Sequence, residues 1–419
     1  MPEGINQSAT GAQTCSALRR ALLDHKQASL SPGICNNTGR TSRRGLLLNT
    51  SPLPSQPRRI VLVNPTRYLG NLLIAGGLIQ SFAEHCQARG IEFKVVVDEP
   101  FVELLSAALP AASLLPYPRQ ALKKAGPLGK LKVYWAFLRR LRHLRADIAF
   151  NIEEDSTSDR LTRWSGARYR LGCSAARHKR SYEKVLPIEF VDRPKARKHR
   201  WYSFMEVFAA LGMNESQAGY VRFTPGALPV PSLPKLQAQG FEATQPYVVL
   251  HAGATKDYKK WPLAHFAALA QQLSAGGQQV VFIGAGSDAL ATAEVLARLQ
   301  KQSGSGNGNG NGNGRVFDAT NQISLAELGG LLSRASAMVG NDSGPFHLAA
   351  ALGVKGVVIF GPTDASLWRP LGANVRVLQN RAVCDATCSR ASCLKERACL
   401  QTIEPSLVIS ALRDLDVVG

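Results

Sequence analysis

The stretch from Ala337 to Phe360 decides the fold, and it reads AMVGNDSGPFHLAAALGVKGVVIF. A short apolar run at each end predicts a strand, and Phe346 to Leu352 between them predicts a helix. Asp342 or Ser343 is placed to cap this helix, and Pro345 suits its first turn. A strand, a capped helix and a second strand form the repeating unit of a parallel α/β sheet.

The same alternation continues outward from this stretch in both directions. In the second half we expect strands at Tyr247–His251, Gln279–Ile283 and Val316–Phe317, and helices at Pro262–Leu273, Ala289–Lys301 and Leu325–Ser333. In the first half we expect strands at Ile60–Val63, Phe93–Val97 and Ile148–Ile152, and a helix at Leu72–Cys86. The sequence therefore predicts two doubly wound α/β domains, at 57–225 and 226–419, joined by a Pro-rich linker.

Two segments lack this alternation. Residues 1–56 are rich in Ser, Thr, Asn, Gly and Arg, and we expect them to be a disordered extension. Their Arg excess also resembles a transit peptide in composition, and a start codon placed too far upstream would leave the same pattern. Residues 304–314 form a Gly/Asn/Ser low-complexity run, which predicts a flexible surface loop.

The composition is that of a globular protein with an unusual basic excess. Hydrophobic residues make up 45% and charged residues 19% of the 419 residues, which excludes collagen, a coiled coil and wholesale disorder. The net charge is +20, of which residues 119–200 contribute +14. Such a patch favours nucleic acid, an acidic lipid surface or a phosphorylated glycolipid as the partner, and the alternative is a solvated basic face.

The basic stretch includes a candidate amphipathic helix, and no run in the chain is long and apolar enough to predict a membrane span. Residues 130–145 are expected to form this helix. Its apolar side is expected to consist of Leu131, Tyr134, Trp135, Leu138 and Leu141. The sequence therefore predicts a protein that could lie on a membrane without crossing it.

Four of the eight cysteines cluster near the C-terminus, at positions 384, 388, 393 and 399. Their spacings do not form a standard CxxC pair, so a cluster of structural thiols is preferred to a zinc site or a disulfide. The first thirty residues lack the apolar core of a secretory signal, which favours a reducing, cytoplasmic compartment.

Three loops of the second half follow predicted strands, where ligands of such sheets bind. The loop 251–262 contains a hydroxyl and lysines that suit a pyrophosphate, although a solvated loop would look the same. The loop 284–288 is a weak glycine turn. The loop 340–347 offers an anion the start of a helix, Asp342 could accept sugar hydroxyls, and His347 could reach the same crevice or be a core histidine.

These loops resemble glycosyltransferase family 9, which contains the lipopolysaccharide heptosyltransferases. The motifs that resemble it are Lys259-Lys260-Trp261-Pro262, the run from Asn341 to Gly353, and Phe360-Gly361-Pro362-Thr363-Asp364. The resemblance spans about residues 59–415. It implies a GT-B fold, in which two Rossmann-like domains face a cleft. It also implies an inverting, metal-independent transfer of a sugar from a nucleotide donor, with no cofactor.

The resemblance also assigns residues to the donor. It implies Thr255 and Lys259 as contacts of the donor phosphates, and Ser287 and Asp288 as neighbours of the nucleoside. It implies a donor crevice formed by Asp342, Ser343, Gly344 and His347. For heptosyltransferases the donor is ADP-heptose and the acceptor is the anionic lipopolysaccharide inner core, which agrees with the basic first half. We therefore expect contact with the cytoplasmic face of the inner membrane.

One position departs from the family pattern. The family's first loop usually has an Asp after the Gly, placed to accept the proton of the acceptor hydroxyl, whereas this chain has Asn71. A carboxamide cannot act as a general base. Substitutes could be Asp98, Asp155 or Asp159, and nothing in the spacing selects one.

Asn71 therefore leaves a second hypothesis beside the active enzyme: a binding protein for a nucleotide-sugar or core glycolipid with impaired catalysis. A nucleic-acid binder rests only on the net charge. The basic residues lack interleaved aromatic side chains for stacking on bases, so no nucleic-acid partner is expected.

Overall fold

The computed structural model describes most of the chain from Gln56 onward. The described residues are 56–153, 155–172, 184–185, 199–213, 221–302, 315–384, 393 and 396–419. The predicted disordered tail, 1–56, lies outside the described residues except for its last position. The predicted Gly/Asn loop, 304–314, lies wholly outside them.

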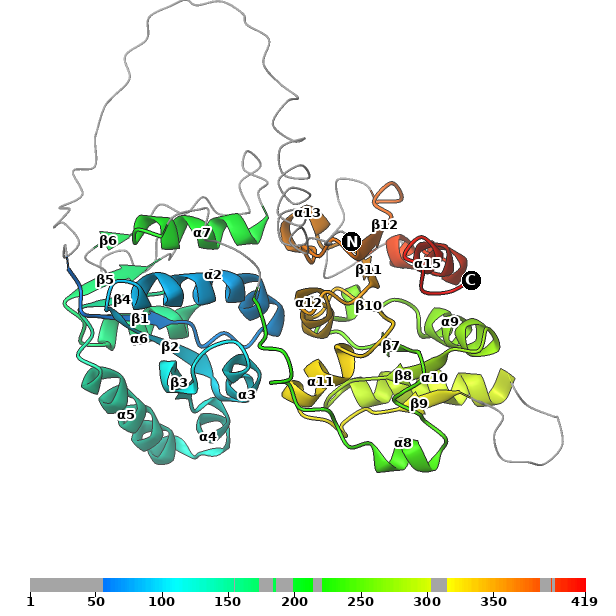
Figure 1. The fold of residues 1–419 in the computed structure, drawn as a ribbon, viewed down its shortest axis with the longest axis horizontal. Coiled ribbons are helices and arrows are strands. Elements are labelled where there is room, and N and C mark those ends of the chain that lie inside the picture. Colours follow the sequence, from blue (N-terminus) through cyan, green and yellow to red (C-terminus); the bar gives the residue numbers. More distant parts are fainter. Residues whose placement is uncertain are drawn as a thin grey trace, which may run out of the picture. The chain divides into compact units, whose positions relative to one another are not determined.

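The first half forms a parallel sheet with the strand order β3-β2-β1-β4-β5-β6 (Figure 1). Its strands are β1 (Arg59–Val63), β2 (Glu92–Asp98), β3 (Leu114–Tyr117), β4 (Ile148–Phe150), β5 (Tyr169–Gly172) and β6 (Lys184–Val185). Its helices are α2 (Leu69–Gln87), α3 (Val102–Ser106), α4 (Arg119–Lys124), α5 (Pro127–His143), α6 (Ser156–Trp164) and α7 (Arg200–Ala210).

Both faces of this first sheet are buried, because its central strand is apolar at every position after the first. Ile60 and Leu62 enter one cluster with side chains of α2 and α7. Val61 and Val63 enter another with side chains of α5 and α6. Helices on both faces are what an all-parallel sheet requires.

The second half repeats the topology, with the strand order β12-β11-β10-β7-β8-β9 (Figure 1). Its strands are β7 (Tyr247–His251), β8 (Gln279–Phe282), β9 (Val316–Asp318), β10 (Ala337–Asn341), β11 (Gly356–Phe360) and β12 (Val375–Gln379). Its helices are α8 (Pro234–Ala238), α9 (Leu263–Ala275), α10 (Asp288–Gln302), α11 (Leu325–Leu332), α12 (Gly344–Ala351), α13 (Ala365–Trp368), α14 (Ala398–Gln401) and α15 (Pro405–Arg413).

One face of the second sheet packs against α9, α10 and α15, and the other against α11 and α12. The predicted doubly wound α/β class is therefore confirmed for both halves. The exact domain boundaries, 57–225 and 226–419, stay predictions.

Each sheet has a point where the strand order reverses. The first strand of each half lies in the middle, so β1 has β2 and β4 as neighbours, and β7 has β8 and β10. The connections diverge at this point, and a crevice opens beyond the carboxyl ends of the two strands. Residues that follow β1 and β4, or β7 and β10, are therefore placed to meet a ligand.

The predicted helix over 130–145 begins earlier, at Pro127, and its apolar side chains do not share one environment. Leu138 and Leu141 are buried, whereas Leu131 and Trp135 are 55% and 50% exposed. The predicted helix is therefore confirmed with an earlier start, and among its predicted apolar side chains Leu138 and Leu141 enter the core. None of the helices within the described residues is long and apolar enough to span a bilayer.

Candidate functional site

The candidate donor site is built at the point between β7 and β10. The two strands pair with Gly340 opposite His251, which brings the loops after them together. Asn341 at the end of β10 holds the neighbouring loop: its Nδ2 donates to the carbonyls of Ala252 and Gly253 at 3.0 and 3.1 Å. Its Oδ1 accepts the backbone N–H of Trp261 at 2.9 Å. One buried amide therefore shapes the loop that contains the predicted lysine.

An ion pair occupies this point. The Lys259 ammonium donates to Asp342 Oδ2 at 2.6 Å. The Asp342 side chain is only 4% exposed, while that of Lys259 is 23% exposed, so the carboxylate lies behind the ammonium. The carboxylate thus holds one N–H of the ammonium and leaves the others available to an anion from solvent.

A second polar chain lies beside the ion pair. His251 Nδ1 and Ser343 Oγ share a hydrogen bond of 3.0 Å, and His251 Nε2 lies 3.3 Å from Asp288 Oδ2. Burial raises the pKa of Asp288, but the contact with His251 outweighs it and the net pKa is lowered. A Cβ on Gly253 would overlap the Asp288 carboxylate, so only glycine permits this approach.

Ser343 does not cap the helix as predicted. It occupies the position before α12, but its side chain makes no capping hydrogen bond, because the hydroxyl is engaged with His251. The first-turn amides of α12 are therefore not covered by this side chain. Such amides, together with the positive end of the helix dipole, favour an anion.

His347 lies in α12 and is buried. Burial lowers the pKa of His347 to about 4, so its imidazole is neutral at physiological pH. It can exchange hydrogen bonds but adds no positive charge for a phosphate. A Cβ on Gly70 would lie 2.9 Å from His347 Cδ2, and one on Gly344 would lie 2.7 Å from Leu69 Cβ. The first turns of α2 and α12 thus meet closely.

The structure brings together six of the eight predicted donor residues: Lys259, Asp288, Asp342, Ser343, Gly344 and His347. Thr255 and Ser287 are exposed and do not bond to any of the six within the described part of the chain. The sequence analysis missed His251 as a site residue. His251 could have been identified from the sequence, because it is the last residue of a predicted strand and directly precedes a glycine-containing loop.

The first half has its own polar contact at the corresponding point. Asn71 Nδ2, in the first turn of α2, donates to Glu153 Oε2 at 3.2 Å. Glu153 follows β4 by three residues and is buried. The sequence analysis did not name Glu153, although its position just past a predicted strand end was a usable signal.

The three carboxylates that the sequence offered as substitutes for an Asp at position 71 are engaged elsewhere. Asp98 Oδ2 accepts from Arg119 Nε at 2.5 Å. Asp155 caps α6 by accepting the first-turn amides of that helix. Asp159 Oδ1 accepts from the Asn151 amide at 3.3 Å. None of these contacts involves Asn71, whereas Glu153 Oε2 accepts a hydrogen bond from it.

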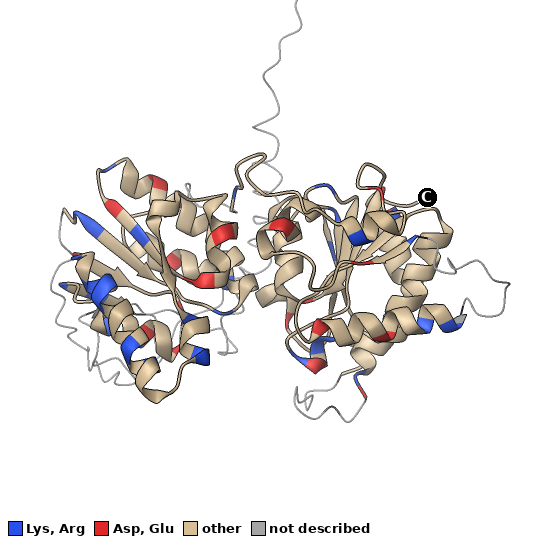
Figure 2. Cartoon of the chain, turned by 90° about the horizontal axis from the view of Figure 1, so that it is seen from below, with Lys and Arg blue, Asp and Glu red and all other residues tan. Residues whose placement is uncertain are grey.

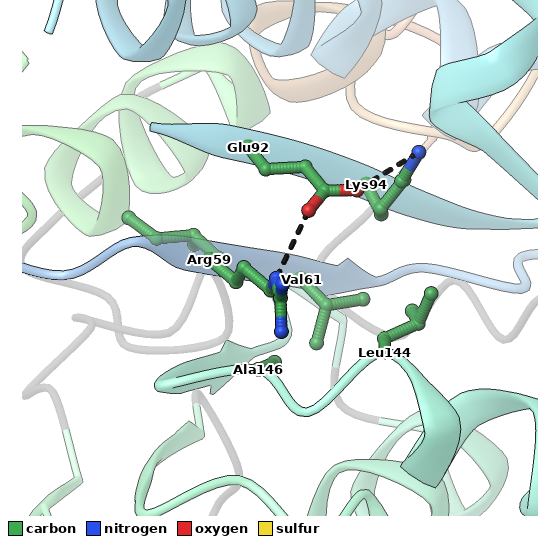
Figure 3. A pocket seen from close by; sticks show the side chains of 7 residues that line it. Arg59, Val61, Glu92, Lys94, Leu144 and Ala146 are labelled. Atoms are coloured by element: carbon green, nitrogen blue, oxygen red, sulfur yellow. Dashed lines mark hydrogen bonds and ion pairs between the residues drawn. The ribbon is translucent and has the colours of Figure 1, made fainter. Parts of the chain in front are cut away.

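A small cavity of about 10 Å³ lies at the amino ends of β1 and β2 (Figure 3). Glu92 lies beside it and bridges Arg59 and Lys94 at 3.1 and 3.2 Å. A volume of this size holds about one water, so this cavity is too small for a sugar nucleotide.

No group of three or more His, Cys, Asp or Glu side chains within the described residues is arranged to hold a metal ion. Cys384, Cys393 and Cys399 are free thiols. Cys388 lies outside the described residues.

Comparison with known proteins identifies the family of this chain. The family model of glycosyltransferase family 9 (heptosyltransferase) matches residues 134–398. Lipopolysaccharide heptosyltransferase 2 of Escherichia coli K12 is 27% identical over 340 residues, which is 77% of this chain and 88% of that protein.

Solved structures show the same fold. The E. coli ADP-heptose lps heptosyltransferase II has a TM-score of 0.64 at 21% identity, covering 85% of this chain and 98% of that one. The E. coli heptosyltransferase WaaC with ADP has a TM-score of 0.61 at 21% identity, covering 85% and 99%. The predicted GT-B class, with two Rossmann-like sheets, is confirmed.

Proposed function

The chain belongs to glycosyltransferase family 9 (heptosyltransferase), and from this premise we propose that it transfers a heptose from ADP-heptose to the inner core of lipopolysaccharide. The chain is therefore a glycosyltransferase. The donor is proposed because one similar structure was solved with ADP and another is that of an ADP-heptose lps heptosyltransferase. The acceptor is proposed from the names of the curated relatives.

The observation that supports the donor site most strongly is the Lys259–Asp342 pair at the reversal point of the second sheet. We assign the donor diphosphate to the ammonium of Lys259 and to the positive end of the α12 dipole. Ser343, Asp288 and His251 hold the loops around it. Thr255 and Ser287 can contribute only if the donor itself reaches them, because both are exposed.

The proposed reaction is a single displacement with inversion. The acceptor hydroxyl oxygen attacks the anomeric carbon, the bond from that carbon to the phosphate oxygen breaks, and the nucleoside diphosphate leaves with the electron pair. Negative charge grows on the leaving diphosphate. Lys259 and the dipole of α12 are placed to stabilise this charge.

We further propose that the first half contacts an anionic membrane surface on the cytoplasmic side, where the acceptor lies. Leu128, Leu131 and Trp135 on α5 are 85%, 55% and 50% exposed. Exposed lysines and arginines accompany them: Lys123, Lys124, Lys130, Lys132, Arg139 and Arg140. Figure 2 shows basic residues on the helices that flank this sheet. Basic residues around exposed Leu and Trp are typical of helices that lie in a lipid interface.

The donor assignment is tested by titrating ADP-heptose into the wild type, Lys259→Ala and Lys256→Ala by calorimetry. A charge-assisted hydrogen bond contributes ~1.5–3 kcal/mol, so Lys259→Ala is expected to bind about 10- to 100-fold more weakly. Lys256 is an exposed lysine of the same loop and serves as the matched control. Unchanged affinity in Lys259→Ala would remove the donor from this site.

Asn71 favours a second candidate function: a protein that binds the nucleotide-sugar or the core glycolipid without turnover. This reading predicts donor binding without transfer in the wild type. It also predicts that Asn71→Asp, by supplying a carboxylate, creates activity. Transfer by the wild type would exclude it.

A further inference from the structure

The reversal point of the first sheet contains a buried polar cluster. Three segments meet there: the loop after β1, the first turn of α2 and the loop after β4. They bring Asn64, Asn71 and Glu153 to one edge of the sheet. Asn71 and Glu153 are 82 residues apart in the chain and share the 3.2 Å hydrogen bond.

Three buried polar atoms of this cluster lack a hydrogen-bond partner among the described residues. Glu153 is 7% exposed, and within the described residues its Oε1 has no hydrogen-bond partner. Both polar atoms of the fully buried Asn64 side chain are also unpartnered there. Buried polar groups are nearly always hydrogen-bonded, so a concentration of exceptions marks a place where a polar group from outside completes the network.

We propose that Glu153 is the catalytic base of this transferase, which accepts the proton of the attacking acceptor hydroxyl, and that Asn71 is the residue that positions it. The inference rests on the proposed function. The family usually has its basic carboxylate in the first turn of α2, where this chain has Asn71. In this chain the proposed base instead follows the neighbouring strand, β4.

The position of the cluster suits this role. Asn71 directly follows Gly70, whose Cα is so close to His347 that a Cβ would lie 2.9 Å from the imidazole. The pair is therefore next to the start of α12, where we place the leaving diphosphate. Asn71 is half-buried and forms the outer member of the pair. A hydroxyl that arrives at this turn meets the amide first, with the carboxylate behind it, within the reach of one bridging water.

The proton step balances through that water. The acceptor hydroxyl gives its proton to the water as its oxygen bonds to the anomeric carbon, and the water gives a proton to Glu153 Oε1. The bond from the anomeric carbon to the diphosphate breaks in the same step, and the diphosphate keeps the electron pair. The protonated carboxyl returns its proton to solvent after the product leaves.

The electrostatic surroundings raise the pKa of this carboxyl, which is the direction that makes its carboxylate a stronger base. Burial is the largest influence on the pKa of Glu153 and raises it. The hydrogen bonds from Asn71 and Thr66 and the charge of Arg200 lower the pKa, while the charge of Asp155 raises it further. The net effect is a raised pKa. A general base is most effective when its pKa lies close to the working pH. Transfer must then rise with pH as Glu153 loses its proton.

The test compares Glu153→Gln with two other neutralised carboxylates, with ADP-heptose as donor and heptose-free lipopolysaccharide as acceptor. Glu153→Gln is expected to lose about 10²- to 10⁴-fold in kcat and to keep its affinity for ADP-heptose. Glu103→Gln, an exposed carboxylate on α3, is the matched control and is expected to keep the wild-type rate. Asp159→Asn removes a buried rival carboxylate in the next helix.

The outcomes separate the inference from the function on which it rests. A wild type that transfers heptose, together with a Glu153→Gln variant that does so equally well, overturns the inference alone. Loss of transfer in Asp159→Asn but not in Glu153→Gln also overturns it. A wild type that neither binds ADP-heptose nor transfers heptose overturns both the function and the inference.

A second variant keeps the test decisive if Glu153→Gln folds poorly. Asn71→Ala removes the hydrogen bond that lowers the pKa of Glu153, so the acid limb of the kcat profile is expected to move to higher pH. A merely structural Asn71 would change the rate or the melting temperature and leave that limb in place. An unmoved acid limb overturns the positioning role of Asn71 and the assignment of the limb to Glu153.

Discussion

The two reversal points of this molecule share a topology and differ in how their polar groups are paired. Between β7 and β10 the charged and polar side chains pair with one another, as Lys259 with Asp342 and as His251 with Ser343 and Asp288. Between β1 and β4, the side-chain amide of Asn64 and the Oε1 atom of Glu153 have no hydrogen-bond partner among the described residues. The second half presents the preformed Lys259–Asp342 ion pair, to which we assign the donor diphosphate. The first half contains a carboxylate that another molecule must complete.

The order of the strands determines where a ligand site can form, and the side chains at that point determine its chemistry. Both places lie beyond the carboxyl ends of central parallel strands. The second presents an ammonium and helix amides, which suit the leaving phosphates. The first presents a buried carboxylate, which suits a proton. The predictions below begin with the largest expected effect.

The variant Asn71→Asp would break the comparison most sharply. It places a second carboxylate at hydrogen-bond distance from Glu153, and two like charges so close cannot both ionise easily. We expect the upper pKa of the carboxylate pair to rise, and kcat on the acid limb to fall by about 10-fold per unit of that rise. A pH–rate profile measures both effects.

The same variant separates this inference from the impaired-catalyst reading. A rate at pH 7 that rises in Asn71→Asp would contradict the role of Glu153 and support a lost catalytic Asp. Asn71→Ser, which adds no charge, is the control for a change in shape alone.

The exposed face of α5 offers a second way to sharpen the comparison of the halves. The double variant Leu131→Ser and Trp135→Ser is expected to reduce binding to vesicles that contain acidic phospholipid by about 10-fold, because two large apolar side chains leave the interface. Co-sedimentation measures the bound fraction. Leu407→Ser on α15 is the matched control, since Leu407 is 51% exposed in the other half. Equal losses in both variants would remove the membrane role from α5.

The smallest expected effect is on stability. The pKa of Glu153 is raised in the folded chain, so its stabilising contribution is full below the unfolded pKa of about 4.3 and is lost as pH rises through the folded pKa. Glu153→Gln does not titrate and is therefore expected to be more stable than the wild type at pH 8, by about 1.4 kcal/mol per unit of pKa shift. The difference should shrink towards pH 4.

Urea unfolding at the two pH values measures that difference, with Glu103→Gln as the exposed control. A Glu153→Gln variant that is less stable than the wild type at pH 8 would mean that the charged carboxylate is stabilised by its surroundings. If Glu153→Gln is more stable than the wild type but no longer transfers heptose, the carboxylate lowers stability and is needed for activity, which is typical of active-site residues.

Local patterns were enough to predict most elements of both sheets. Each strand near the middle of a sheet is a short apolar run, and in the second half the loops after β7, β8 and β10 were identified as places for ligands. The elements that escaped prediction are short or lie at sheet edges, such as β3, β5 and β12, where weak apolar runs give little signal. The candidate site was predicted in the same way, loop by loop, because a residue just after a strand end is visible in one segment.

The differences between the predictions and the structure concern which residues a given side chain contacts. Ser343 was expected to cap its own helix and instead binds His251, which is 92 residues away. Leu131 and Trp135 were predicted on the apolar side of their helix with Leu138 and Leu141, and the structure leaves the first two exposed while the other two enter the core. In each case a neighbour that is distant in the chain decided the outcome.

The sequence by itself determined that this chain alternates strands and helices, that its second half contains the donor motifs, and that position 71 is an amide where a carboxylate is usual. Only the tertiary structure decided which side chains meet. The placement of β4 beside β1 brings Glu153 to Asn71, and the placement of β10 beside β7 brings Asp342 and Ser343 to Lys259 and His251. Periodicity along the chain specifies elements, but the order of strands in a sheet arises from packing between distant segments.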